Sequence, residues 1–331
     1  MQTDPSHLHG VEYVGNLGFA VPPTIRSRFM LEIASDLVGR KDFNLRQTRL
    51  TLREQGRRDR TLTLFASDAP SVIDEVVRGE VDVAIINPAA PLTMAVRGTG
   101  PFPEPLPIRA ITVLPSDDYF FFAVSGSTGL HTLDDVRERR YPLRISLRGQ
   151  MDHSNQLLMS QVLALAGFSL DDIVSWGGSV RYDAVPPAHP MRLDDVERGV
   201  LDALFDEGVS WWAPRALSLG MRFLRLGTPI LDQLQSMGLR RRTVTPAEYP
   251  EIGEKFEVID YSGWPVFARV DVSDDYIAAF CRALEARKDR IPWEGTGPLP
   301  LERMVQNQID TPLDVPLHPA AERYWRSRGY L

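Results

Sequence analysis

The chain has 331 residues, a formal net charge of −7 and a single cysteine, Cys281, and 43% of its residues are hydrophobic. This length favours two domains over one core, and the acidic balance argues against nucleic-acid binding, which needs a basic face. The lone cysteine excludes an internal disulfide and a cysteine-based metal site, and no apolar run reaches the roughly 20 residues of a membrane-spanning helix.

Strand-like and helix-like segments alternate from the start of the chain. The pattern predicts a strand over 13–20, a helix over 24–38, strands over 43–51 and 62–65, a helix that ends near 78 and a buried strand over 81–86. The hydrophobic period changes between about 2 and 3.6 residues, which is typical of a sheet with helices on its faces. The chain is therefore predicted to be an α/β protein.

The same sequence pattern occurs at two places where a predicted helix is followed by a predicted strand. Arg78-Gly79-Glu80-Val81-Asp82 and Arg198-Gly199-Val200-Leu201-Asp202 share the pattern Arg-Gly-x-x-Asp, each after a helix and before a strand. The glycines are suited to a left-handed helix end, and the aspartates can satisfy backbone groups. Two copies predict two similar α/β lobes, and ligands on such sheets bind beyond the carboxyl ends of the strands.

Later strands indicate where the chain passes between the lobes. An outgoing strand is predicted over 118–124, and strands over 256–261 and 266–270 flank the return. We expect lobe I to comprise 1–117 plus 265–331 and lobe II to comprise 118–264. Closure about a hinge between them would bury a ligand in the interlobe cleft.

Several segments, in order, resemble the TAXI family of solute receptors, which are the binding subunits of one class of TRAP transporter. The segments are Pro316-Leu317-His318-Pro319-Ala320-Ala321, Asp82 to Ile86, Gly98-Thr99-Gly100-Pro101-Phe102, Arg144 to Leu147, Leu163 to Phe168, and Asp202-Ala203-Leu204-Phe205. The resemblance covers most of the chain from about Leu17 onward. It departs at two expected ligand loops, which read Val21-Pro22-Pro23-Thr24 and Gln150 to Asn155 here.

The resemblance implies a type II periplasmic-binding-protein-like fold that closes over a small organic anion such as a carboxylate. It also implies TRAP-type membrane subunits as partners and a periplasmic location. Residues 1–10 lack the basic region and apolar core of a secretory leader, so a cytoplasmic location is the alternative expectation if the sequence is complete. Neither nucleic acid nor a cofactor is expected.

Three strand-to-helix loops are expected to face the cleft, because helix N-termini present free N–H groups to anions. They contain Pro23 and Thr24, then Ser67 and Asp68, then Arg148, Gln150, Asp152, His153, Ser154 and Asn155. The two aspartates would repel an anion, and helix capping is the alternative role for them.

Further candidates come from the turns and from aromatic residues. Asn87, Asp206 and Glu207 follow the strands of the two repeated joints. Arg144 and Arg148 are candidates for carboxylate recognition, with a structural ion pair as the alternative for each. Of the adjacent Trp211 and Trp212, one is expected in the cleft and one in the core. Trp264, like Tyr119 and Tyr261, lies near a predicted hinge and can stack on a planar ligand.

An enzyme on the same fold is the main alternative function. Asp152-His153-Ser154, with Asp206 and Glu207 across the cleft, can provide a general base for a decarboxylase or dehydratase that acts on a carboxylate. The sequence lacks a His-x-x-x-His metal spacing, a Gly-x-Ser-x-Gly elbow and a phosphate-binding glycine loop. We therefore expect a binding protein without catalysis or metal, and a cytoplasmic ligand sensor is a third possibility.

Overall fold

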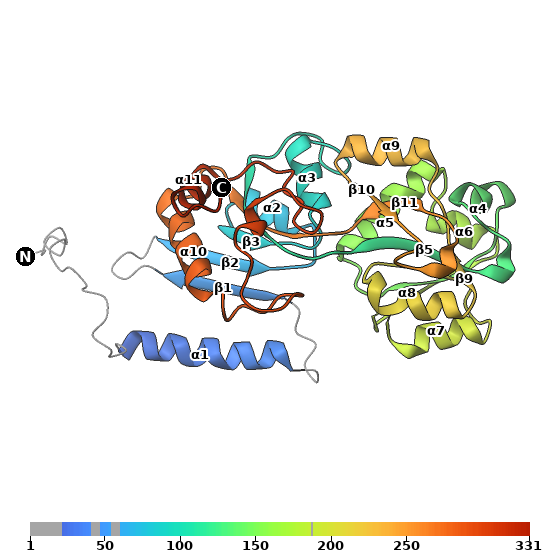
Figure 1. Cartoon of the computed structure of the whole chain (residues 1–331), viewed down its shortest axis with the longest axis horizontal. Coiled ribbons are helices and arrows are strands. Elements are labelled where there is room, and N and C mark those ends of the chain that lie inside the picture. The colour runs from blue at the N-terminus through green and yellow to red at the C-terminus, as the bar shows by residue number, and fades with distance from the viewer. Residues whose placement is uncertain (1–21, 41–46, 54–59, 187) are drawn as a thin grey trace, which may run out of the picture. The chain divides into compact units, whose positions relative to one another are not determined.

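The computed structural model describes residues 22–40, 47–53, 60–186 and 188–331 (Figure 1). The chain forms two compact units, residues 1–46 and 47–331, which are described separately. In the first unit, α1 (Pro22–Gly39) confirms the predicted helix over 24–38 and begins with two prolines, which suit the first turn of a helix. The predicted strand over 13–20 and the part of the next strand before 47 lie outside the described residues.

The second unit contains two sheets, and the first has the strand order β1-β2-β3-β12-β4. Its strands are β1 (Thr48–Arg53), β2 (Thr61–Ala66), β3 (Val83–Ile85), β4 (Ile108–Leu114) and β12 (Trp264–Arg269). Strands β2 and β3 are parallel, whereas β12 runs antiparallel to both β3 and β4. A strand from late in the chain therefore occupies the interior of this sheet.

Helices cover both faces of the first sheet. They are α2 (Val72–Val77) and α3 (Ala90–Arg97) on one face and α10 (Asp274–Arg287) and α11 (Pro319–Ser327) on the other, with a short 3₁₀ turn at Arg303–Val305. Ala84 packs with α2 and α3, whereas its neighbour Val83 packs with α10 and α11, as the two-residue period of a strand requires. The terminal helix is fixed by Trp325, which is fully buried and donates its indole N–H to the Ile111 carbonyl at 2.9 Å.

The second sheet has the order β10-β11-β5-β8-β6-β7, and β9 also pairs with β5. Its strands are β5 (Tyr119–Ser125), β6 (Arg144–Arg148), β7 (Ser179–Asp183), β8 (Ala203–Asp206), β9 (Met221–Phe223), β10 (Arg241–Val244) and β11 (Phe256–Asp260). Strand β6 is parallel to β7 and β8, and β5 is antiparallel to β8. The carboxyl ends of β6 and β8 therefore meet the amino end of β5 at one edge.

Helices again form two outer layers. One face packs against α4 (Leu133–Arg139), α5 (Ser154–Ala166), α6 (Leu170–Ser175) and α9 (Thr228–Met237), and the other packs against α7 (Pro190–Glu197) and α8 (Val209–Ser218). Short 3₁₀ turns lie at Gly126–Thr128 and Pro250–Ile252. Along β5, Phe120 and Phe122 point to the first of these layers and Phe121 to the second.

The two Arg-Gly-x-x-Asp joints have the same hydrogen bonds. Gly79 and Gly199 have positive φ angles of 76° and 69°, as predicted for left-handed helix ends. The Asp82 carboxylate accepts from the Thr63 N–H at 2.7 Å, while the Asp82 N–H donates to the Thr63 carbonyl at 3.0 Å. Asp202 makes the equivalent pair with Arg144, at 3.0 and 2.8 Å. The prediction that these aspartates satisfy backbone groups is confirmed.

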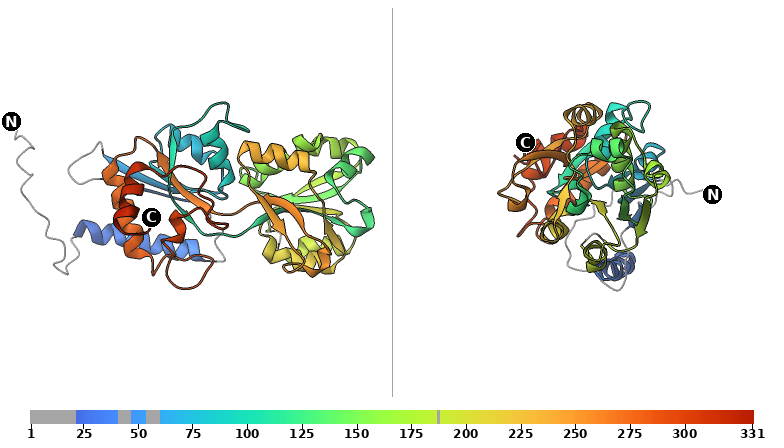
Figure 2. Two further views of the ribbon diagram at one scale, coloured as in Figure 1. Left: turned by 45° about the horizontal axis from the view of Figure 1, so that its top comes forward. Right: turned by 90° about the vertical axis from the view of Figure 1, so that its right-hand side faces the viewer.

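The chain passes between the sheets twice, at residues 115–118 and 261–263, which makes a two-lobed α/β fold as expected. The domain bounds of 1–117 plus 265–331 and 118–264 stay a prediction. Helix α3 of the first sheet and α9 of the second lie beside each other in Figures 1 and 2, and the Thr99 hydroxyl donates to the Met237 carbonyl at 2.5 Å.

Candidate functional site

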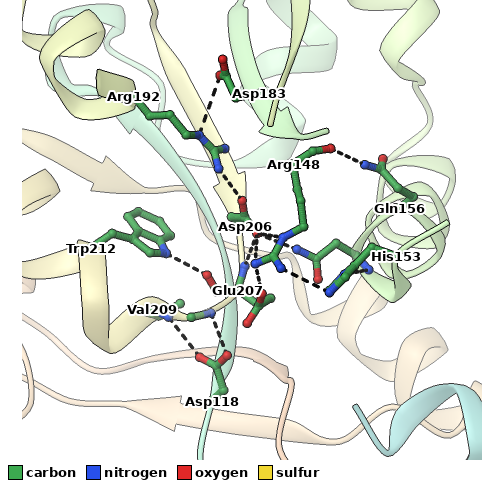
Figure 3. Close-up of polar contacts among 12 residues, drawn as sticks. Asp118, Arg148, His153, Gln156, Asp183, Arg192, Asp206, Glu207, Val209 and Trp212 are labelled. Atoms are coloured by element: carbon green, nitrogen blue, oxygen red, sulfur yellow. Dashed lines mark hydrogen bonds and ion pairs between the residues drawn. The ribbon is translucent and has the colours of Figure 1, made fainter. Parts of the chain in front are cut away.

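The candidate site lies at the carboxyl edge of the second sheet. Arg148 is the last residue of β6, Asp206 is the last residue of the parallel strand β8, and Asp118 directly precedes β5. Because Phe121 of β5 pairs with Asp206, the start of β5 reaches this same edge. The strand order therefore brings three charged side chains together from distant parts of the sequence (Figure 3).

Asp206 is the structural centre of this cluster. It is 0% exposed, and its carboxylate accepts from Arg192 Nη1 at 2.8 Å, Asn155 Nδ2 at 2.6 Å, its neighbour's backbone N–H at 3.0 Å and Arg148 Nε at 3.3 Å. Arg192 is also 0% exposed and donates Nε to the Ser146 hydroxyl at 2.7 Å. Buried charges of this kind persist only when they are paired and fully hydrogen-bonded, so this part of the cluster is rigid.

Glu207 is the second carboxylate on Arg148. Its Oε1 accepts from Arg148 Nη2, and the residue is 8% exposed. Burial raises the pKa of Glu207 well above its ordinary value; Arg148 opposes this rise, and the carboxylates of Asp118 and Asp206 add to it. Burial also raises the pKa of Asp118, although hydrogen bonds to it from Glu207 and from backbone N–H groups act in the other direction.

Asp118 fixes the start of α8. Its carboxylate accepts from the Gly208 N–H at 2.7 Å and the Val209 N–H at 3.1 Å, which are the first free N–H groups of that helix. Asp118 therefore has a capping role and contributes its negative charge to the cluster beside Glu207.

The N-terminus of α5 completes the cluster. His153 is the N-cap residue, 2% exposed, and its Nδ1 accepts from the Asn155 N–H at 3.1 Å. This bond places the proton of a neutral ring on Nε2, which lies 3.3 Å from Arg148 Nη1. The guanidinium group of Arg148 and the imidazole ring of His153 therefore lie close together at the carboxyl edge of the second sheet.

Histidine is used as a helix cap in two further places. His189 accepts from the Met191 N–H at the start of α7, and His318 accepts from the Ala320 N–H at the start of α11. Helix capping was the alternative role for Asp152, but the structure gives the cap to His153 and leaves Asp152 exposed. Gln150 lies in the preceding turn, where its carbonyl accepts from the His153 N–H at 3.3 Å.

The carboxyl edge of the first sheet meets this helix N-terminus. The Ser154 N–H and hydroxyl both donate to the Asp68 carbonyl, at 3.0 and 3.1 Å. Asp68 follows β2, and the hydroxyl of its neighbour Ser67 accepts from the Ala69 N–H at 3.1 Å. The structure thus brings two of the predicted loops, those of Asp68 and Ser154, into direct contact.

Three buried side-chain oxygens near the crossing segments have no hydrogen-bond partner in the described part of the chain. They are Asn87 Oδ1, Asn155 Oδ1 and Tyr261 Oη. Asn87 follows β3, and the Ala89 N–H two residues later donates to the Ser262 carbonyl at 3.3 Å. Burial raises the pKa of Tyr261 well above its ordinary value, and the charge of Glu207 adds to the rise. Unpartnered buried polar atoms are rare in native proteins and often mark functional sites.

Other predicted site residues lie elsewhere. Arg144 begins β6, about 13 Å along the strand from Arg148 at 3.3 Å per residue, and it pairs with Asp202 through Nε at 2.7 Å. Trp212 is fully buried, as expected for one of the tryptophans, and donates to the Glu207 carbonyl at 2.9 Å, whereas Trp211 is 78% exposed. Trp264 is half-buried at the start of β12.

Pro23 and Thr24 lie in the first turn of α1, but their side chains are outside the described residues. The part of the chain that the structure describes contains no group of three or more His, Cys, Asp or Glu side chains placed to hold a metal ion. Among those same residues, no helix is both long enough and apolar enough to cross a membrane.

Comparisons with known proteins give the following similarities. No protein-family model matches the chain, and no curated protein matches it. Among solved structures, the chain is similar to the periplasmic aliphatic sulphonate-binding protein SsuA of Escherichia coli, with 14% identity and a TM-score of 0.34 over 65% of this chain and 57% of that chain. It is also similar to PhnD1 of Prochlorococcus marinus in complex with methylphosphonate, with 12% identity and a TM-score of 0.38 over 79% and 83%.

A third similar structure is the glycine betaine and L-proline-binding protein ProX of Borrelia burgdorferi, with 11% identity and a TM-score of 0.36 over 63% of this chain and 64% of that chain. The matched part thus spans about 57% of the Escherichia coli protein's length. SsuA and ProX are described as binding proteins, and PhnD1 was solved with methylphosphonate. The identities are low, so the description of the site rests on the contacts of this chain alone.

Proposed function

We propose that this protein is a solute-binding protein that closes its two lobes over a small organic anion and releases it unchanged. The observation that carries the proposal is the position of Arg148, whose Nη1 faces His153 Nε2 at the edge where the second sheet meets the first. Guanidinium groups bind carboxylate and related oxyanions through paired hydrogen bonds, and a buried setting strengthens each bond.

A carboxylate fits this proposal best among oxyanions, because a planar group can lie against the edge of a guanidinium. Sulphonates and phosphonates offer the same negative oxygens in tetrahedral form, and those are the ligand classes named for two of the neighbours. The ligand class is therefore to be tested with all three groups.

The transport role rests on the resemblance to TAXI receptors, which implies TRAP-type membrane subunits and a periplasmic location. The neighbour from Borrelia burgdorferi belongs to an ABC transporter, a different class. Purification of the tagged protein from its native membranes distinguishes the two: recovery of TRAP-type subunits supports the receptor role proposed here, and recovery of an ATPase subunit contradicts it.

Isothermal titration calorimetry with small carboxylates, sulphonates and phosphonates tests the binding role. We expect Arg148→Ala to weaken binding by about tenfold or more, in line with the 1.5–3 kcal/mol typical of hydrogen bonds to charged groups. Arg144→Ala is the matched control, because it lies on the same strand but pairs with Asp202 at the other end. Equal affinity in wild type and Arg148→Ala would place the ligand elsewhere.

Product analysis of the same mixtures tests the enzyme alternative. A lyase needs a proton donor, and the buried Glu207 carboxyl beside Arg148 is the residue with the chemistry for that role. Chemical conversion of a bound carboxylate that is lost in Glu207→Gln would replace the binding proposal with an enzymatic one.

A further inference from the structure

The two carboxylates on Arg148 are held in different ways. Asp206 accepts four hydrogen bonds, two of them from side chains other than Arg148, and it has no exposed surface. Among the described residues, Arg148 is the side-chain donor to the Glu207 carboxyl group, which is also hydrogen-bonded to Asp118; Trp212 bonds to the Glu207 backbone carbonyl instead. Asp206 is therefore the fixed partner of Arg148, and Glu207 is the partner that can be exchanged.

The surroundings of Glu207 also favour its release. The titratable and charged groups that face it come from four elements: Asp118 before β5, Arg148 of β6, Asp206 of β8 and Tyr261 after β11. Trp212 of α8, which bonds to the Glu207 backbone carbonyl, is uncharged. Two of these groups are carboxylates, so a negative charge on Glu207 is opposed by like charges, and among these described groups Arg148 is the one that compensates it.

We infer that Glu207 is an internal occupant of the anion position on Arg148, and that a bound solute displaces its side chain from the guanidinium. This inference rests on the proposed binding function. A carboxyl oxygen on Arg148 Nη2 occupies one of the hydrogen-bonding positions that a ligand oxyanion would use. The neutral carboxyl group gives way to an anion easily, whereas the ionised form competes with it.

The specificity of the site follows from this competition. A solute must bind Arg148 more tightly than the Glu207 side chain does. When Glu207 is ionised, a neutral amide or alcohol cannot do this against the charged carboxylate. Among the described residues, Asn155 Oδ1 and Tyr261 Oη have no hydrogen-bond partner and are buried beside the same groups, so a solute that also carries a hydroxyl or ammonium donor gains a second contact. A small anion that bears a hydrogen-bond donor is the solute class that this arrangement selects.

Calorimetric titration of pyruvate and methanesulfonate between pH 5 and 9 tests the displacement. Both probes are fully ionised throughout this range, so any change in affinity arises from the protein. We expect the wild-type affinity to fall by up to about tenfold per pH unit once Glu207 ionises, which is the limit for one coupled proton. Glu207→Gln should bind as tightly at pH 9 as at pH 5. Glu80→Gln, an exposed glutamate of the first lobe, is the control and should follow the wild type.

The outcomes separate this inference from the binding function. If the wild type binds either probe and Glu207→Gln keeps the same dependence on pH, Glu207 does not occupy the anion position, while the binding function stands. If neither protein binds either probe at any pH, both proposals fail. Should Glu207→Gln not fold, the wild-type profile decides alone, since equal affinity at pH 5 and pH 9 contradicts displacement by a titrating carboxylate.

Discussion

At the carboxyl ends of β2 and β3, the first sheet presents Ser67, Asp68 and Asn87, and the Asp68 backbone carbonyl accepts the hydrogen bond from the Ser154 hydroxyl. At the carboxyl ends of β6 and β8, the second sheet presents an arginine and two buried carboxylates, supported by a second buried arginine. The amino edges, in contrast, carry the same Asp joint in both sheets. The lobes therefore share a scaffold, but the buried charged side chains at the carboxyl edges lie in the second sheet, where we propose that the ligand charge is bound.

Removal of the central carboxylate is the strongest test of this difference. In Asp206→Ala, Arg192 and Arg148 lose their shared partner, and Arg192 has no exposed surface through which water can compensate. We expect the free energy of unfolding to fall by about 3–5 kcal/mol, the range for breaking a buried ion pair. Urea denaturation measures it, with the exposed Asp152→Ala as a control that should change stability by less than about 0.5 kcal/mol. A decrease in the free energy of unfolding of less than about 1 kcal/mol would mean that the charged cluster at the carboxyl edge of the second sheet is not rigid.

Asp260, at the end of β11, extends the same edge and has a pKa raised to about 6 by burial, with the hydrogen bond from Ser262 acting against the rise. A carboxyl group whose pKa is raised by folding stabilises the native state at low pH. That contribution is lost as the pH rises from about 4, the unfolded value, through about 6.

The variant Asp260→Asn has no carboxyl group at this position, so it does not lose this stabilisation as the pH rises. The free energy of unfolding of the variant relative to the wild type should therefore increase between pH 4 and 6, by up to about 3 kcal/mol, and stay level above pH 6. Denaturation curves across this range provide the measurement. A difference that does not vary with pH would show that folding does not raise the pKa of Asp260.

The amino edges of the two sheets carry equivalent aspartates, so we expect similar losses of stability when either aspartate is removed. Asp82→Ala and Asp202→Ala each remove an acceptor for one backbone N–H, so each should destabilise the protein by about 1–2 kcal/mol. The exposed pair between Arg144 and Asp202 should add less than about 1 kcal/mol to the second value. Thermal denaturation of the two variants side by side checks this, and a difference of several kcal/mol would show that the joints are similar only in sequence.

The smallest expected effect concerns the contact between the edges. Ser154→Ala removes the hydroxyl bond to the Asp68 carbonyl but keeps the N–H bond, so the loss should be about 0.5–1 kcal/mol. Ser160→Ala, whose hydroxyl bonds only within α5, is the matched control. Faster amide hydrogen exchange at Ser154 in the first variant, but not in the second, would locate the effect at the contact between the sheets.

The parts of the fold that the sequence predicts well depend on residues that are close together in the sequence. The repeated joints follow from glycines that adopt positive φ angles and from aspartates beside them, so two copies are visible without any knowledge of packing. The insertion of β12 between β3 and β4 is a distant pairing. A buried apolar strand is compatible with several neighbours, and its pattern alone does not choose among them.

The site shows the same limit. His153, Asn155 and Glu207 were predicted because they lie in loops beyond strand ends, where ligands usually bind. Asp118, Ser146 and Arg192 were missed, because their roles arise from packing within strands and helices. A charged residue between the apolar Met191 and Leu193 is the one local signal for Arg192. Arg144 and Arg148 lie on the same face of β6. The direction of this strand decides that Arg144 forms an ion pair with Asp202 at the amino end, whereas Arg148 lies in the candidate site at the carboxyl end.

The interior position of β12 has a consequence for synthesis. All seven strands of the second sheet lie within residues 119–260, whereas the first sheet gains an interior strand only at 264–269 and its terminal helix at 319–327. During translation, which proceeds from the N-terminus, the second sheet is available in full while the first still exposes the apolar edges of β3 and β4. A ribosome-bound chain of this protein therefore carries a complete charge-bearing lobe before its companion lobe can form.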